Sequence, residues 1–153
     1  MEEQRKELQV AALENGTAID HIPSDQVFKV VSLLELEKLK NPITIGNNLE
    51  SKKMGRKGII KIADKFFAQD ELNRIALIAP NVVLNIIKDY KVIEKKHVEL
   101  PQIITNIVRC NNPKCITNNE PMQTKFEITD RNNIELKCLY CDIKIQKDDI
   151  ILI

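Results

Sequence analysis

The sequence has almost no net charge and no long hydrophobic stretch. Its 153 residues include 23 Lys and Arg against 22 Asp and Glu, for a formal net charge of +1. A protein that binds nucleic acid through its overall field needs a marked basic excess, so any anion site here must be local. No run of about 18 apolar residues, the length that spans a membrane, is present. The charges among the first 15 residues also argue against a secretory leader, and we expect a cytoplasmic protein without a membrane partner.

Sequence patterns typical of enzymes are missing as well. The chain has no His-Glu-x-x-His metal motif, no Walker loop, no dinucleotide-binding glycine pattern and no nucleophile elbow. Its two histidines, His21 and His97, lie far apart and belong to no recognisable triad. We therefore expect a binding or regulatory protein rather than an enzyme.

Cysteine is scarce and unevenly placed, since all four cysteines lie beyond residue 109. Cys110 and Cys115 are spaced Cys-x4-Cys, and Cys138 and Cys141 are spaced Cys-x2-Cys after a gap of 22 residues. Cytosolic thiols stay reduced, and two close pairs are typical of a tetrahedral four-thiolate zinc site. The spacing predicts one structural Zn²⁺ per chain.

Other interpretations of the four cysteines remain open. They could form two disulfides, stay as inert buried thiols, or hold an iron–sulfur cluster. A catalytic zinc is a further alternative, but four thiolates fill the tetrahedral shell and leave no position for water.

Proline and charge divide the chain. A charged stretch, 94–99, and Pro101 precede the apolar run 103–108, so we expect a domain boundary within 96–102. This gives a first domain over residues 1–100 and a second over residues 101–153. A piece of roughly 50 residues ordinarily needs a cross-link or a metal to hold together, and all four cysteines fall within it.

Hydrophobic periodicity predicts an α+β fold. For the first domain we expect strands at 17–22, 43–45, 59–62, 82–87 and 90–98, helices at 24–39 and 70–79, and a polar loop at 46–55. The order β-α-β-β-α-β-β is that of a ferredoxin-like α/β sandwich, in which two helices cover one face of an antiparallel sheet. Short runs at 103–109, 124–129, 134–138 and 143–152 predict a small C-terminal all-β zinc-binding domain.

Polar residues interrupt the apolar strands of the first domain at three places. Asp20 and His21 stand among apolar neighbours, and Asn85 lies within another apolar strand. Lys57 and Lys61 share a strand face because they are four residues apart. Ammonium groups near a carboxylate suit a nucleoside triphosphate, with Asp20 on a ribose hydroxyl. The alternative is that these are ordinary solvated strand positions.

Several stretches resemble the regulatory chain of aspartate carbamoyltransferase. They are LQVAALENGTAIDHIP (8–23), ITIGNNL (43–49), MGRKGIIKI (54–62), LIAPNVVLNII (77–87) followed by Tyr90, NNPKC (111–115) and KCLYC (137–141). The resemblance covers essentially the whole chain, and the order of the domains and their boundary match as well. The sequence departs from the family pattern at Ala11, at Lys114 and in the gap between the cysteine pairs, which is one residue shorter.

The resemblance implies a non-catalytic allosteric subunit that controls the first committed step of pyrimidine biosynthesis. Its first domain would bind nucleoside triphosphates, with CTP and UTP as inhibitors and ATP as an activator. Its zinc domain would dock on a separate catalytic chain, and the regulatory chain itself would form homodimers. Carried over position by position, the effector pocket comprises main-chain groups at Ala12 and Leu13 and the residues Asp20, His21, Lys57, Lys61, Asn85, Ile87, Tyr90, Val92 and Lys95.

A zinc-ribbon protein that binds nucleic acid is the alternative function. From Pro101 onward, however, seven basic residues stand against seven acidic ones, and only Phe126 and Tyr140 offer aromatic surfaces for stacking on bases. The segment lacks material for both phosphate contacts and base stacking. We therefore expect no nucleic-acid partner.

Overall fold

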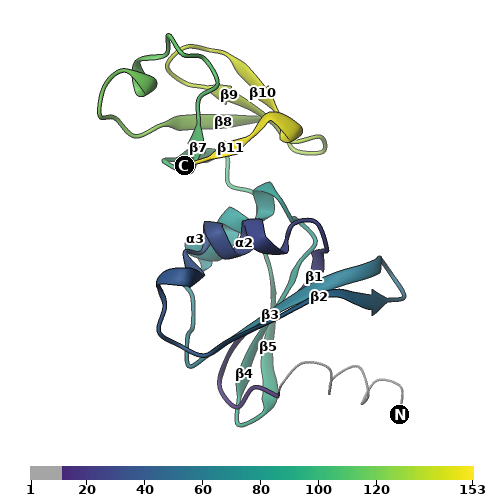
Figure 1. Ribbon diagram of the computed structural model, residues 1–153. Coiled ribbons are helices and arrows are strands. Elements are labelled where there is room, and N and C mark those ends of the chain that lie inside the picture. The colour runs from purple at the N-terminus through teal and green to yellow at the C-terminus, as the bar shows by residue number, and fades with distance from the viewer. Residues whose placement is uncertain (1–11) are drawn as a thin grey trace. The chain divides into compact units, whose positions relative to one another are not determined.

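The computed structural model describes residues 12–153, so the first eleven residues of the expected first domain, including the departure at Ala11, lie outside the described residues. The chain divides into two compact units, of which the first ends at Glu99 and the second is Leu100–Ile153. Figure 1 shows the first unit as a sheet with helices and the second as a group of short strands. Within residues 12–153, no helix is long and apolar enough to cross a membrane.

The first unit is built on a five-stranded antiparallel sheet with the order β2-β3-β1-β4-β5. Its strands are β1 (Gly16–Pro23), β2 (Ile43–Ser51), β3 (Gly55–Ala63), β4 (Val83–Lys88) and β5 (Lys91–His97). Because β3 lies between β1 and β2, the helical connection after β1 leads to a strand that is not its neighbour. This split βαβ arrangement, extended by β5, confirms the predicted α+β fold.

The first helix is shorter than predicted. α2 spans Val27–Leu33, whereas the sequence predicted a helix over 24–39. Glu35 adopts a left-handed backbone conformation with φ of 52°, which an α-helix cannot contain. The chain then continues as a separate 3₁₀ turn, Leu36–Lys38.

Two other boundaries differ from the sequence-based expectation. α3 spans only Gln69–Asn73 and continues as the 3₁₀ turn Arg74–Leu77, where a helix over 70–79 was expected. The polar loop expected at 46–55 is largely strand, because β2 and β3 extend through it to a tight turn. A shift in register with Asn48 at a φ of 58° lets β2 pass through these turn-forming residues.

One face of the sheet carries the core of the first unit. Ile19 of β1, Ile60 of β3 and Leu84 of β4 lie opposite one another in register and are fully buried. α2 and α3 lie on the same side of the sheet (Figure 1). α2 approaches closely because position 58 is glycine: a Cβ on Gly58 would lie 2.0 Å from Cγ2 of Val27.

The second unit consists of short strands and two 3₁₀ turns. β6 (Ile103–Thr105), β8 (Lys125–Asp130), β9 (Glu135–Cys138) and β10 (Lys144–Gln146) form a sheet of order β10-β9-β8-β6, and β7 (Val108–Arg109) pairs with β11 (Ile151–Leu152). Besides three of the cysteines, its buried apolar residues are Ile104, Val108, Phe126, Ile128, Ile134, Leu136 and Ile145. Cys110, Cys115 and Cys138 are thus buried together with a small set of apolar side chains.

Candidate functional site

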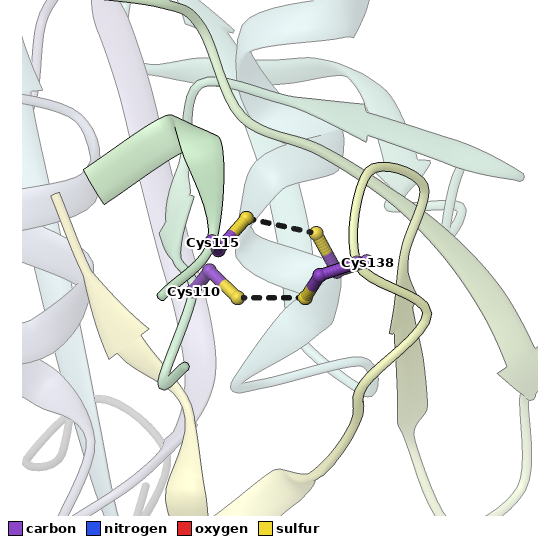
Figure 2. A group of neighbouring side chains, drawn as sticks. Cys110, Cys115 and Cys138 are labelled. Carbon is purple, nitrogen blue, oxygen red and sulfur yellow. Dashed lines mark hydrogen bonds between the residues drawn. The ribbon is translucent and has the colours of Figure 1, made fainter. Parts of the chain in front are cut away.

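Four thiols converge in the second unit. Cys110 follows β7, Cys115 precedes the 3₁₀ turn Ile116–Asn118, Cys138 ends β9, and Cys141 lies in the turn beyond it. Their Sγ atoms all lie within 4.8 Å of one another. The Sγ atoms of Cys110 and Cys141 are 3.6 Å apart, and those of Cys115 and Cys138 are 3.8 Å apart. Figure 2 shows Cys110 and Cys115 approaching from one side and Cys138 from the other.

These spacings match those of a tetrahedral metal centre. Four sulfur atoms at about 2.3 Å from a central ion lie about 3.8 Å from one another. The two shorter separations in the cluster are close to this value, and all four cysteines are free thiols. The cluster therefore fits a metal ion bound by four thiolates.

Burial and backbone hydrogen bonds act on the thiols in opposite directions. Burial raises the pKa of Cys110 and of Cys138, because a thiolate there loses its hydration. Backbone N–H groups oppose this shift: Asn112 donates to Cys110, and Tyr140 and Cys141 donate to Cys138. The same N–H groups would stabilise thiolates bound to a cation.

Cys141 differs from the other thiols. Burial tends to raise its pKa, but the Ile143 backbone N–H, the Asn112 side chain and the neighbouring thiols of Cys110 and Cys138 together lower the pKa of Cys141 to about 7. Because thiolates rather than thiols bind metals, this lowered pKa favours Cys141 as a metal ligand near neutral pH.

Three polar residues beside the cluster were missed by the sequence analysis. Oγ1 of Thr117 lies 3.1 Å from Sγ of Cys115. Asn118 and Asn119 donate hydrogen bonds to main-chain carbonyls of the loop that carries the first cysteine pair. These residues follow no helical or strand periodicity, so the sequence analysis had no pattern by which to find them. The one available signal was their position directly after Cys115.

In the first unit, three of the predicted effector residues lie in one row on the sheet face opposite the buried core, which we call the open face. Lys61 of β3, Ala18 of β1, Asn85 of β4 and Lys95 of β5 lie opposite one another in register, so their side chains share a face. Successive residues of a strand point to opposite faces of the sheet. Lys61 therefore lies on the face opposite to that of its neighbour Ile60, which is buried in the core. The open face therefore carries ammonium groups from two strands around a side-chain amide.

Asp20, His21 and Lys57 come together at an irregularity of β1. The register against β3 shifts between Ile19 and Ile22, and His21 has a φ of 60°. Oδ1 of Asp20 accepts a hydrogen bond from the backbone N–H of His21 at 2.7 Å and lies 2.9 Å from Nζ of Lys57. Nδ1 of His21 is 3.7 Å from Oδ2 of Asp20. The bulge thus places a carboxylate, an imidazole and an ammonium group side by side.

The remaining predicted residues lie at the β4 and β5 end of the sheet. Ile87 and Val92 are partners in register. Tyr90 lies in the turn between the two strands, and its backbone N–H donates to the carbonyl of Glu14 at 2.9 Å. This hydrogen bond brings the turn next to the segment that follows residues 12–13. All the predicted effector residues therefore belong to the first unit.

Two buried polar atoms on these residues have no hydrogen-bond partner among residues 12–153. They are Oδ1 of Asn85 and Nδ1 of His21. Buried polar atoms in proteins are normally paired. Among the described residues, these two atoms leave hydrogen-bonding capacity for a polar ligand.

An open polar sheet face in one unit and four converging thiols in the other define a two-domain binding protein with a metal-binding module. Residues 8–99 match the family model described as the allosteric domain of the aspartate carbamoyltransferase regulatory chain, and residues 102–151 match the one described as its metal binding domain. The chain belongs to the family of aspartate carbamoyltransferase regulatory chains.

Individual relatives agree over the full length of the chain. An aspartate carbamoyltransferase regulatory chain from Parabacteroides distasonis is 66% identical over 150 residues, covering 98% of this chain and 97% of its own. One from Bacteroides fragilis is 59% identical over the whole of both chains, and one from Pyrococcus abyssi is 46% identical over 95% of this chain and 97% of its own. The protein is therefore a regulatory and not a catalytic subunit, and a catalytic chain is its partner.

Proposed function

We propose that this regulatory chain binds nucleoside triphosphates on the open sheet face of its first domain, residues 1–100. In the proposal, CTP and UTP inhibit the catalytic chain and ATP activates it. The observation that carries the proposal is the row in which Lys61, Asn85 and Lys95 share one face across three strands. Because the net charge of the whole chain is only +1, the overall field of the protein attracts a triphosphate weakly. A local cluster of lysines can supply that attraction instead.

Each group has a chemical role in this proposal. The ammonium groups of Lys57, Lys61 and Lys95 bind phosphate oxygens, and Asp20 accepts a hydrogen bond from a ribose hydroxyl. The 2.9 Å ion pair between Asp20 and Lys57 orients both side chains before the nucleotide arrives. The turn at Tyr90 and the main chain at residues 12–13 provide hydrogen-bonding groups for the base.

The metal in this proposal is zinc, one ion per chain, bound by Cys110, Cys115, Cys138 and Cys141. Four thiolates select zinc or an iron–sulfur cluster over harder cations, and a filled tetrahedral shell makes the ion structural. Bound zinc supplies a cross-link between the two cysteine-bearing segments. A reducing cytoplasm, which keeps the thiols free for the metal, is the location we propose.

The proposal extends to the assembly. The second domain, residues 101–153, docks on the catalytic chain, and two regulatory chains form a homodimer. The names of the relatives support a catalytic partner, and the separation of the polar sheet face from the thiol cluster supports a division of labour between effector binding and docking.

Isothermal titration of the full chain with CTP and ATP tests the nucleotide site. Lys95 and Lys96 are neighbours on β5 whose side chains point to opposite faces, so Lys96→Ala is a matched control for Lys95→Ala. A hydrogen bond to a charged group contributes about 1.5 to 3 kcal/mol, so Lys95→Ala and Lys61→Ala should weaken binding at least about tenfold. Lys96→Ala should leave the affinity nearly unchanged.

The holoenzyme provides the second measurement. Lys61→Ala should lose the response of carbamoyltransferase activity to nucleotides while keeping the metal content and the nucleotide-free rate. If Lys61→Ala and Lys95→Ala bind nucleotides as tightly as the unaltered chain, the open face is not the effector site.

A further inference from the structure

The loop 110–115 is braced from outside by two asparagines. Each asparagine donates both hydrogens of its side-chain amide to main-chain carbonyl oxygens of this loop. The four bonds join Nδ2 of Asn118 to the carbonyls of Cys110 (2.9 Å) and Asn112 (2.7 Å), and Nδ2 of Asn119 to those of Pro113 (3.1 Å) and Cys115 (2.9 Å). The carbonyls of both cysteines are among the four.

The shorter cysteine pair is fixed by hydrogen bonds of its own turn. The backbone N–H groups of Tyr140 and Cys141 donate to the thiol of Cys138. The backbone N–H of Asp142 donates to the carbonyl of Cys138 at 2.9 Å. The loop between Cys110 and Cys115 also has such bonds, from the Asn112 N–H to the Cys110 thiol and from Cys115 N to the Asn112 carbonyl at 3.0 Å. Because this loop is two residues longer, Asn118 and Asn119 add support that the shorter pair does not need.

Local backbone geometry brings the two asparagines to the loop. A 3₁₀ turn, Ile116–Asn118, begins directly after Cys115 and reverses the chain. It is closed by hydrogen bonds from Asn118 N to the carbonyl of Cys115 at 2.9 Å and from Asn119 N to that of Ile116 at 3.0 Å. Both side-chain amides then lie against the loop. Asn118 is half-buried, so water competes little for its two short bonds.

We propose that Asn118 and Asn119 are positioning residues of the metal site, which hold the thiols of Cys110 and Cys115 in place and so slow the release of the metal. The inference rests on the proposed four-thiolate site. A bound ion leaves only after thiolates detach, and a thiolate detaches when the backbone that carries it moves. By tying four carbonyls together, the two amides make the longer loop move as one body, whereas an unbraced loop of this length would release its cysteines one at a time.

The rate of zinc transfer from the full-length chain to the chromogenic chelator 4-(2-pyridylazo)resorcinol measures this effect. Asn118→Ala removes two of the four bracing bonds, those to the carbonyls of Cys110 and Asn112, and Asn118→Asp keeps the size of the side chain but replaces the donor amide by a carboxylate that cannot donate. Asn133→Ala is the control, because it removes an amide that binds Asp130 at 3.2 Å in the turn between β8 and β9. We expect zinc transfer from both Asn118 variants to be about tenfold faster than from the unaltered chain, and transfer from the control to be unchanged. Tenfold is the lower end of the range seen when hydrogen bonds that support metal ligands are lost.

A second readout separates positioning from general stability. In the cobalt(II)-substituted chain, Asn118→Asp should change the thiolate-to-cobalt absorption bands, whereas Asn133→Ala should leave them as they are. If Asn118→Ala does not fold, Asn119→Ala, which removes the two bonds to Pro113 and Cys115, gives the same test. Equal transfer rates from the zinc-loaded wild type and variants, together with identical spectra of the cobalt-substituted chains, would overturn the positioning role alone. A wild-type chain that takes up no zinc would instead refute the metal site itself.

Discussion

Removal of the metal should unfold the second unit and leave the first unit folded. A structural zinc in a small module contributes about 10 to 16 kcal/mol at neutral pH, whereas entire domains are stable by only about 5 to 15 kcal/mol. The contribution of the metal is thus as large as the total stability that a unit of this size can be expected to have. Leu100–Ile153 should not remain folded without it.

The structure explains why the effect should stop at the boundary between the units. The thiols join the segment after β7 to the end of β9, and both lie within Leu100–Ile153. The first unit is instead stabilised by apolar packing between its sheet and helices, through residues such as Ile19 and Leu84. No cysteine belongs to it, because all four lie beyond residue 109.

Hydrogen–deuterium exchange, followed by mass spectrometry with and without a strong zinc chelator, measures both units in one sample. We expect peptides that contain β8 and β9 to lose their protection on chelation, and peptides that contain β1, β3 and β4 to keep theirs. Cys138→Ser should reproduce the chelated pattern, and added zinc should restore protection in the unaltered chain only. Persistent protection of β8 and β9 after complete removal of the metal would refute the reasoning.

Three further predictions concern single sites and pH. Gly58→Val should lower the free energy of unfolding of the first unit by about 1 to 3 kcal/mol in urea titrations, because the new Cβ would collide with Val27. Adding Val27→Ala to the same chain should recover part of the loss. Thr17→Val should cost about 1 to 3 kcal/mol in that assay, because it leaves the Lys65 carbonyl without its 2.7 Å bond from a fully buried hydroxyl; an unchanged midpoint would contradict this. Zinc affinity should fall as the pH is lowered, since protons compete with the metal for the thiolates, and the pKa of metal-free Cys141 is about 7. A zinc affinity that stays constant as the pH is lowered would argue against thiolate ligation.

Periodicity predicted the strands of the first unit but not where its helices end. The apolar spacing of a helix continues through the region around Glu35, while the left-handed backbone of that one residue ends the helix. Gly46 and Asn48 favour a turn in the sequence, yet both lie within β2. An edge strand can absorb such residues in a bulge, because it is paired on one side only. Neither outcome can be derived from local propensity.

The two candidate sites differ in how much the sequence revealed. The convergence of four thiols follows from their spacing, and alternation alone places Lys57 and Lys61 on one face. That Asn85 and Lys95 join the same row depends on the strand order and on the register of β1, β3, β4 and β5, which are set by tertiary contacts. The other predicted effector residues, such as Tyr90 and Lys95, came from the resemblance to a known family and not from the pattern.

The proposed nucleotide site and the four-thiol cluster lie in different units, so their ligands act on separable folding equilibria. A ligand stabilises the unit that binds it by about 2.7 kcal/mol at a hundredfold excess over Kd. If the units were independent, CTP would raise only the unfolding transition of the first unit and leave the metal-dependent transition unchanged. If the catalytic chain docks on the second unit, as proposed, its regulation requires that part of the free energy of nucleotide binding reaches that unit. By reciprocity, the same free energy must appear as an effect of the catalytic chain on nucleotide affinity. The coupling free energy can therefore be obtained from the ratio of two Kd values, that of CTP for the free regulatory chain and that of CTP for the holoenzyme.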